Sequence, residues 1–353
     1  MRQWKKATAL GLGLALTFGQ ATCAEVIIEP IPIAAETEST AAGSASAPAG
    51  EASGSVSSEE NKGPGVPKPA EAFGVAAGPG VMPEAAQTAE TAMPEEPAVA
   101  AEGAVLLDAA NGKILYGKNQ DAQFYPASIT KIMTALVVLE RCNLSDTVTF
   151  SESATTNLES GAVSLDITAG DTLTVEQCLY GLLLKSANEI GNGLAEHVAG
   201  SVSAFADLMD EKARELGCLN TNFENPHGLN DSEHKTTPYD MALIMRAALQ
   251  NDTFRKIDTT TAYKFPATQK AGERTITMGH KMMYPTDSRY YEGIIGGKTG
   301  YTSKAGNTLV TAVERDGVRL IAVVMKAKGT QYTDTKAMFD YGFANYSALT
   351  AQR

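Results

Sequence analysis

Cysteine and histidine are scarce in this sequence, and Lys and Arg, 29 in number, are outnumbered by 41 Asp and Glu. Four cysteines in 353 residues do not make a disulfide framework, because disulfide-dense scaffolds are short and rich in cysteine. Four histidines are present, His197, His227, His234 and His280. They show no metal-ligand spacing, so neither a metal nor another cofactor is predicted. No basic stripe occurs, which argues against a nucleic-acid partner.

Long hydrophobic runs are also missing. The apolar run 7–18 is short of the roughly 20 residues that a membrane-spanning helix needs. It follows a basic cluster and precedes small residues that end at Ala24, which is the layout of a secretory signal peptide over residues 1–24. We therefore predict export to the cell envelope or beyond, with an uncleaved anchor as the alternative. Cleavage would leave Cys142, Cys178 and Cys218, each expected to be a small core residue.

Residues 25–100 contain little that could form a core. They are mostly Ala, Glu, Pro, Gly, Ser and Thr, with Phe73 as their single aromatic residue. Such a segment cannot bury enough apolar surface to offset its ordering entropy, so we predict a disordered linker. It holds twelve Glu against two Lys, and much of the net charge of −12 therefore belongs to it.

An ordered domain is expected over residues 101–353, with strands near both ends. The expected strands are 104–108 and 113–116, around Asn111-Gly112, and 308–313 and 319–325, around Asp316-Gly317. The expected helices are 127–140, 175–184, 189–199, 201–216, 241–249 and 333–346. Two terminal hairpins can pair into one antiparallel sheet, flanked by helices, with an all-helical insertion between them. The fold class predicted is α+β.

Ser128 and Lys131 form the first candidate for chemistry. Residues three apart on a helix face the same way, so the hydroxyl and the amine can approach each other. The following residues are nearly all apolar, and a lysine buried among them has a lowered pKa and can accept a proton from serine. Alone, the pair also fits a helix-capping serine with a lysine that reaches solvent.

Two further motifs follow along the chain. Ser186-Ala187-Asn188 lies between two apolar helices, where a hydroxyl and an amide could complete a proton relay. Lys298-Thr299-Gly300 follows an apolar strand and continues into Tyr301-Thr302, and a lysine beside threonine suits a carboxylate. Each motif alone is also compatible with an ordinary polar loop or a glycine-rich turn.

Together, the three motifs in this order resemble the signature of penicillin-binding proteins and class A β-lactamases. The surroundings at 125–128, 185–189, 225–229 and 297–302 make residues 101–346 similar to the low-molecular-mass D-alanyl-D-alanine carboxypeptidases. The resemblance implies the serine β-lactamase/DD-peptidase fold, peptidoglycan stem peptides ending in D-Ala-D-Ala as substrates, and β-lactams as covalent inhibitors.

The resemblance also assigns roles to the motif residues. It makes Ser128 the nucleophile and Lys131 its base, with Ser186 and Asn188 as proton relay and substrate-amide contacts. Lys298 and Thr299 would bind the terminal carboxylate, and Gly300, Tyr301 and Thr302 would complete the substrate-binding strand. The amides of Ser128 and Tyr301 would form the oxyanion hole.

Two other functions remain open from the sequence. Glu224 lies near the place where a class A β-lactamase carries its deacylating glutamate, although the residues around it resemble the carboxypeptidases. A non-catalytic sensor that is acylated by β-lactams without turnover is the second alternative.

Overall fold

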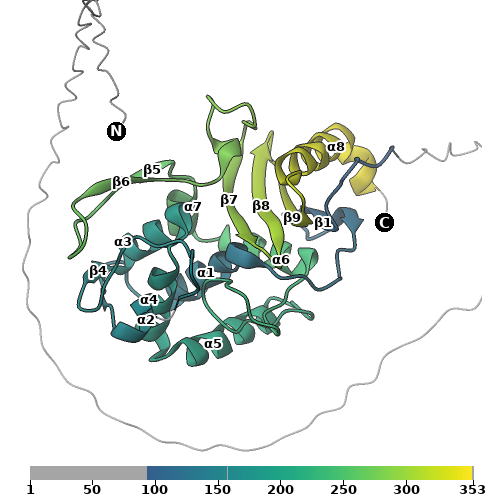
Figure 1. Cartoon of the computed structure of the whole chain (residues 1–353). Coiled ribbons are helices and arrows are strands. Elements are labelled where there is room, and N and C mark those ends of the chain that lie inside the picture. The colour runs from purple at the N-terminus through teal and green to yellow at the C-terminus, as the bar shows by residue number, and fades with distance from the viewer. Residues whose placement is uncertain (1–93, 157, 352–353) are drawn as a thin grey trace, which may run out of the picture. The chain divides into compact units, whose positions relative to one another are not determined.

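The computed structural model describes residues 94–156 and 158–351, shown in colour in Figure 1. The predicted signal peptide and residues 25–93 of the predicted linker lie outside the described residues. Within the described part of the chain, no helix combines the length and the apolar character needed to cross a membrane.

The domain contains a five-stranded antiparallel sheet with the strand order β2-β1-β9-β8-β7. Its strands are β1 Gly103–Asp108, β2 Ile114–Lys118, β7 Ile294–Thr302, β8 Gly306–Arg315 and β9 Val318–Ala327. Both predicted hairpins are confirmed. Strand β1 pairs with β9, with Val105 opposite Val323, so the two ends of the domain meet in one sheet as predicted.

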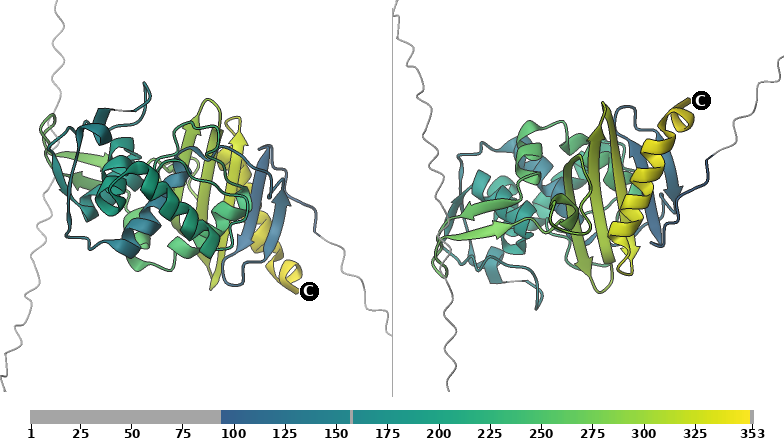
Figure 2. Two further views of the ribbon diagram at one scale, coloured as in Figure 1. Left: turned by 90° about the horizontal axis from the view of Figure 1, so that it is seen from below. Right: turned by 90° about the horizontal axis from the view of Figure 1, so that it is seen from above.

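Both faces of the central strands are buried, because their consecutive apolar residues point in turn to one face and then to the other. Val105 and Leu107 of β1 pack into the larger core with the helical part. Ala104 and Leu106, one residue out of phase, pack on the other face against α8, Gln331–Ala351. Figure 2 shows α8 lying across that face of the sheet.

The chain between β2 and β7 builds the helical part of the domain. Its helices are α1 Lys131–Arg141, α2 Glu152–Thr156, α3 Val175–Tyr180, α4 Asn188–Ala199, α5 Val202–Glu215, α6 Pro238–Ala248 and α7 Asp252–Asp258, with the short turns η1 Ala127–Thr130, η2 Gly181–Lys185 and η3 Lys281–Met283. The part is helical as predicted, except for two small hairpins that the sequence analysis missed. They are β3 Thr147–Thr149 with β4 Thr172–Thr174, and β5 Ala262–Phe265 with β6 Arg274–Thr277.

Two predicted helices begin or end in irregular turns at the candidate site. The helix expected from 127 starts as the 3-10 turn η1 and becomes α-helical at Lys131. The helix expected to end at 184 closes with the π-turn η2, after which Ser186 takes a left-handed conformation with φ 68°. Both motif serines are therefore presented by the ends of helices, beside the sheet edge formed by β7.

The start of the domain is fastened to α8. The amide of Ala101 donates to Asp334 Oδ2 at 2.9 Å, and Lys118 Nζ donates to the carbonyl of Val99 at 2.7 Å. Ala101 is buried. Because Val99 and Ala100 also contact the domain, the predicted linker boundary after residue 100 falls inside the packed structure, and the domain includes these residues.

Candidate active site

The Lys131 amine lies at the centre of a buried polar group. Its Nζ is 3.2 Å from Ser128 Oγ, 2.7 Å from Asn188 Oδ1 and 2.7 Å from the carbonyl oxygen of His227. The side chain is fully buried. A neutral amine has two hydrogens and one lone pair, so it can donate to Asn188 and His227 while its lone pair faces the Ser128 hydroxyl.

The electrostatic surroundings favour this neutral amine. Burial holds the pKa of Lys131 well below its usual value, and the positive charge of Lys298 lowers it further, while Glu189 acts in the opposite direction. Desolvation disfavours the charged form of a lysine, which turns the amine into a proton acceptor near neutral pH. The predicted approach of Ser128 and Lys131 is present in the structure.

Ser128 is held in place by unusual backbone contacts. Ala127 has φ 52°, and its carbonyl lies against Gly228, where a Cβ would collide with the Ala127 backbone. Thr308 Oγ1 of β8 donates to the carbonyl of Pro126 at 2.8 Å. The turn that carries Ser128 is thus fixed between the His227-Gly228 turn and the sheet.

Ser186 and Asn188 occupy different depths beside Ser128. Ser186 lines the cleft, and its Oγ makes no hydrogen bond within the described residues. Asn188 is 2 % exposed, and its Nδ2 donates to the carbonyl of Val163 at 3.0 Å while its Oδ1 accepts from Lys131. The Asn188 amide is therefore engaged with the protein, and its position suits the orientation of Lys131.

Strand β7 forms the opposite wall and passes close to the nucleophile. A Cβ on Gly300 would lie 2.8 Å from the Ser128 amide nitrogen and would also collide with Thr308 Oγ1. Glycine at this position lets the β7 backbone come next to Ser128. Because β7 is the edge strand of the sheet, a substrate can lie along its unpaired side.

Lys298 of β7 and Asp258 are both buried, and each shifts the pKa of the other. Burial lowers the pKa of Lys298 to about 8, an effect that Asp258 opposes. Burial likewise raises the pKa of Asp258 to about 7, opposed by the Gly297 amide and the Lys298 charge. Asp258 Oδ2 accepts from the Gly297 amide at 2.6 Å. The carboxylate therefore supports both the backbone and the charge of the Lys298 segment.

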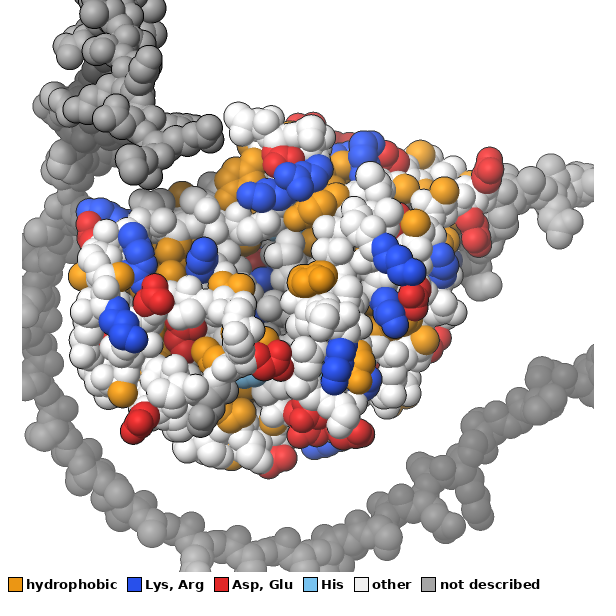
Figure 3. Space-filling view, viewed as in Figure 1, with side chains coloured by type: hydrophobic (Ala, Val, Ile, Leu, Met, Phe, Trp, Pro, Cys, Tyr) orange, Lys and Arg blue, Asp and Glu red, His pale blue; other side chains and the backbone are white. Residues whose placement is uncertain are grey.

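Several of these residues line one cleft of about 400 Å³, and Figure 3 shows that face of the molecule hollowed between the helical part and the sheet. Its lining includes Ser128, Ser186, Lys298, Thr299, Gly300 and Tyr301. A larger cavity of about 570 Å³ lies by α6 and the β8–β9 turn. Its described lining contains no Ser or Cys, so it offers no serine or cysteine nucleophile.

Comparison with known proteins decides the family. The family model described as D-alanyl-D-alanine carboxypeptidase, peptidase S11, matches residues 89–329. This chain belongs to the D-alanyl-D-alanine carboxypeptidase family.

Similar members come from distant bacteria. The chain is 32 % identical over 253 residues to D-alanyl-D-alanine carboxypeptidase DacF of Bacillus subtilis, covering 70 % of this chain and 63 % of that protein. It is 35 % identical over 247 residues to DacB2 of Mycobacterium tuberculosis, covering 68 % of this chain and 81 % of that protein. The crystal structure of the Streptomyces K15 DD-transpeptidase is 31 % identical, with a TM-score of 0.65, and covers 71 % of this chain and 99 % of that chain. The predicted α+β penicillin-binding fold is confirmed.

Two residues considered in the sequence analysis, Thr302 and Glu224, lie outside the lining of this cleft. Thr302 does not line the cleft, and its Oγ1 accepts from the Ala305 amide at 3.0 Å in the turn after β7. Glu224 is exposed, accepts from Asn222 Nδ2 at 2.8 Å and is absent from the cleft lining. None of the described residues that line the cleft is an Asp or a Glu, so the carboxylate that the β-lactamase alternative requires is missing there.

Three of the four histidines are buried and make hydrogen bonds that suit a structural role. His227 Nδ1 accepts from the Leu229 amide at 3.1 Å. His234 Nε2 is 2.9 Å from Thr130 Oγ1, and His280 Nε2 is 2.7 Å from Thr311 Oγ1. Burial lowers the pKa of each, for His234 and His280 to about 3. The structural role predicted for His227 agrees with these contacts.

The sequence analysis missed several residues of the site. The His227 carbonyl contacts Lys131 through its backbone, which no side-chain pattern reveals. Asp258 lies forty positions before Lys298 and had no motif around it. Tyr332, at the start of α8, also lines the cleft. Each reaches the site through tertiary packing rather than through local spacing.

Proposed function

We propose that this chain is a serine-type D-alanyl-D-alanine carboxypeptidase that removes the terminal D-alanine from peptidoglycan stem peptides. The contact between the buried Lys131 amine and Ser128 Oγ, at 3.2 Å, carries the proposal. The family membership supports the reaction class. Because the chain spans 63 % of its DacF relative, the activity of that whole protein is not transferred to it directly.

The first step is acylation of Ser128. Its hydroxyl proton passes to the neutral Lys131 amine while Oγ forms a bond to the carbonyl carbon between the two D-alanines. The amides of Ser128 and Tyr301 stabilise the resulting oxyanion, an effect typically worth roughly 10²–10³ in rate for each donor. Collapse breaks the C–N bond, and the leaving D-alanine nitrogen takes a proton from Lys131 through the hydroxyl of Ser186, a residue that lines the cleft.

The second step releases the stem peptide. Water attacks the acyl carbon, gives its proton to the same amine, and the ester bond to Oγ breaks with return of a proton to Ser128. Lys298 and Thr299 bind the terminal carboxylate of the substrate, with Asp258 keeping Lys298 charged. In this proposal Asn188 orients Lys131, and Thr302 has no direct role.

The site also accounts for the expected inhibitors and location. β-Lactams mimic D-alanyl-D-alanine and would acylate Ser128, and the absence of a carboxylate in the described cleft lining predicts slow release. Members of the family act on peptidoglycan in the cell envelope. We propose that this chain reaches that compartment by export through residues 1–24.

The test measures D-alanine release from diacetyl-L-lysyl-D-alanyl-D-alanine, beside hydrolysis of a chromogenic cephalosporin. Steady D-alanine release with stoichiometric β-lactam acylation is expected, and Ser128→Ala should abolish both. Ser153→Ala, at an exposed serine of α2, is the matched control and should change neither. Rapid β-lactam turnover without D-alanine release would indicate a β-lactamase, and acylation without either turnover would indicate a sensor.

A structural relative named as a DD-transpeptidase raises the question of the acyl acceptor. Adding glycylglycine to the same assay separates the two outcomes. A new peptide product at constant consumption of substrate would add transpeptidation to the proposed hydrolysis.

A further inference from the structure

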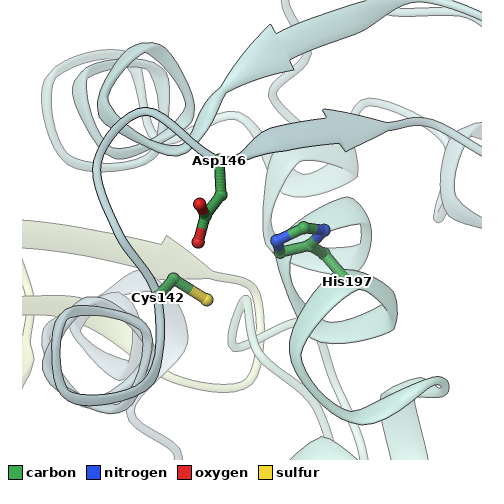
Figure 4. Close-up of side chains that lie close together, drawn as sticks. All are labelled: Cys142, Asp146 and His197. Atoms are coloured by element: carbon green, nitrogen blue, oxygen red, sulfur yellow. The ribbon is translucent and has the colours of Figure 1, made fainter.

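Three side chains with different metal-binding groups converge in the helical part, outside the cleft lining (Figure 4). Cys142 follows the last residue of α1, Asp146 lies in the turn before β3, and His197 lies in the last turn of α4. Their ligand atoms all lie within 4.8 Å of one another. In Figure 4 the thiol, the carboxylate and the imidazole face one common space.

The backbone that presents Cys142 and Asp146 is fixed. The Cys142 amide donates to the Val138 carbonyl at 3.0 Å, and the Asp146 carbonyl accepts from the Val175 amide at 2.9 Å. Asp146 Oδ2 accepts from the Asn143 amide at 2.8 Å. Oδ1 has only a long 3.4 Å contact with Asn143 Nδ2. Hydrogen bonding to one oxygen orients a carboxylate ligand and leaves the other for a metal.

His197 supplies the adjustable third ligand. It is exposed, and it makes no hydrogen bond or ion pair with residues 94–156 or 158–351. Donor atoms around a four-coordinate Zn²⁺ lie roughly 3.3–3.6 Å apart, given bond lengths of about 2.0–2.3 Å. Because the present separations are at most 4.8 Å, a contraction of no more than about 1.2–1.5 Å is needed, and rotation of the exposed imidazole can supply the part that involves His197.

The donor set selects the kind of metal. Thiolate with imidazole and one carboxylate suits Zn²⁺ and disfavours Mg²⁺ and Ca²⁺, which prefer oxygen ligands.

We propose that Cys142, Asp146 and His197 form a Zn²⁺ site, with water as the fourth ligand. Binding breaks the S–H bond of Cys142, forms the S–Zn bond and releases one proton to solvent. The site joins the C-terminal ends of α1 and α4, whose first residues, Lys131 and Asn188, are bonded to each other at 2.7 Å. Zinc would thus hold this helix pair at the end away from Ser128. The proposal does not depend on the proposed function.

Sequence spacing could not reveal this site. Cys142 and Asp146 are four positions apart, but the histidine comes only at 197, after β3, α2, β4, α3 and η2. Cys142 packs against the hydrophobic core but is only partly buried at the end of α1, whereas Cys178 and Cys218 are buried as expected.

The test titrates the metal-free full chain with Zn²⁺ and follows stoichiometry by calorimetry and the melting temperature by scanning. We expect one ion per chain, release of about one proton, and a melting temperature raised by roughly 5–10 °C at 100-fold excess over Kd. Co²⁺ in place of Zn²⁺ should give a near-ultraviolet sulfur-to-cobalt charge-transfer band, which reports thiolate ligation directly.

Three conservative variants decide the ligands: Cys142→Ser, Asp146→Asn and His197→Gln. Each should weaken Zn²⁺ binding by at least about tenfold, and Cys142→Ser should also remove the cobalt band. Asp207→Asn, at an exposed carboxylate of α5, is the matched control and should leave both unchanged. The metal-free melting temperature of each variant shows that it is folded. Unchanged affinity in folded Cys142→Ser and His197→Gln, or a cobalt complex without the band, would overturn the proposal.

Discussion

Lys131 Nζ donates to Asn188 Oδ1 at 2.7 Å, and this bond joins the first residues of α1 and α4. Asn188 is held from its other side by the carbonyl of Val163, to which its Nδ2 donates at 3.0 Å. The amide therefore cannot rotate freely, and it sets the direction in which the Lys131 lone pair points. In the proposed mechanism Asn188 is a positioning residue for the base.

Replacing Asn188 with Asp should move the acidic limb of the kcat/KM profile to higher pH. The new carboxylate beside Nζ stabilises protonated Lys131. Because Lys131 must be neutral to act as a base, the variant becomes active only at a higher pH than wild type. A shift of roughly 1–3 pH units is expected for an adjacent opposite charge. Asn192→Asp, one turn further along α4, is the control and should leave the limb in place. Profiles of Asn188→Asp and wild type that coincide would remove Lys131 as the base.

Replacing Lys298 with Ala should lower kcat/KM far more for substrates that end in a free carboxylate than for the matching amides. The buried ammonium group and Thr299 are proposed to bind that carboxylate, and the loss of a charge-assisted hydrogen bond costs about 1.5–3 kcal/mol, or roughly 10–150-fold in kcat/KM. Lys185→Ala, at an exposed lysine of the same cleft, is the control and should show a small, unselective effect. Equal losses for acid and amide substrates would contradict the assignment.

Replacing Asp258 with Asn should change how stability depends on pH. Burial raises the pKa of Asp258 from 3.8 to about 7, so between these values the native chain retains a proton that the unfolded chain has lost. Wild-type stability therefore falls as pH rises through this window, by on the order of 4 kcal/mol at about 1.36 kcal/mol per pKa unit. The Asn variant lacks this loss, since its amide does not titrate.

Urea unfolding at pH 4.5 and pH 7.5 measures this effect. From pH 4.5 to pH 7.5, the free energy of unfolding should fall more for wild type than for Asp258→Asn. Asp252→Asn, at the exposed first residue of the same helix α7, should follow wild type. A constant difference between Asp258→Asn and wild type would mean that Asp258 is ionised at both pH values.

Replacing Gly300 with Ala should reduce acylation by at least about 10²-fold, the size of effect seen when an oxyanion-hole donor is lost. The added Cβ would lie 2.8 Å from the Ser128 amide and would collide with Thr308 Oγ1, so β7 must move away from the nucleophile. Gly279→Ala is the control in the same cleft, because its nearest neighbour would be Thr299 Oγ1 at 3.4 Å. The measurement is the rate of β-lactam acylation, and equal rates for the two variants would contradict the close approach.

The sequence predicted most of the sheet because its strands carry their own local signals. Asn111-Gly112 and Asp316-Gly317 specify tight turns, and the unbroken apolar runs of β1 and β9 specify strands that are buried on both faces. The missed hairpins β3–β4 and β5–β6 have three- and four-residue strands, too short for a periodic pattern. Strand β7 was found by its motif, although its full length through Thr302 depends on pairing with β8.

The candidate site was predictable where its residues lie three positions apart or in a short motif. Ser128, Lys131, Ser186 and Lys298 fall in this class, and the structure brings them together. The role of Asn188 changed because its amide partners, Lys131 and Val163, lie far away in the chain. The contacts of Asp258 and of the His227 carbonyl belong to tertiary packing, which neither composition nor spacing encodes.

The contact of Ala101 with Asp334 has a mechanical consequence. It ties the entry of the chain to α8, while Lys118 of β2 holds Val99 at the sheet edge opposite β7. Tension applied to the chain before residue 94 would load these bonds and the β2–β1 edge first. Strand β7, at the far edge, would carry little of that load, so the cleft geometry should persist while the domain is pulled from its N-terminal side.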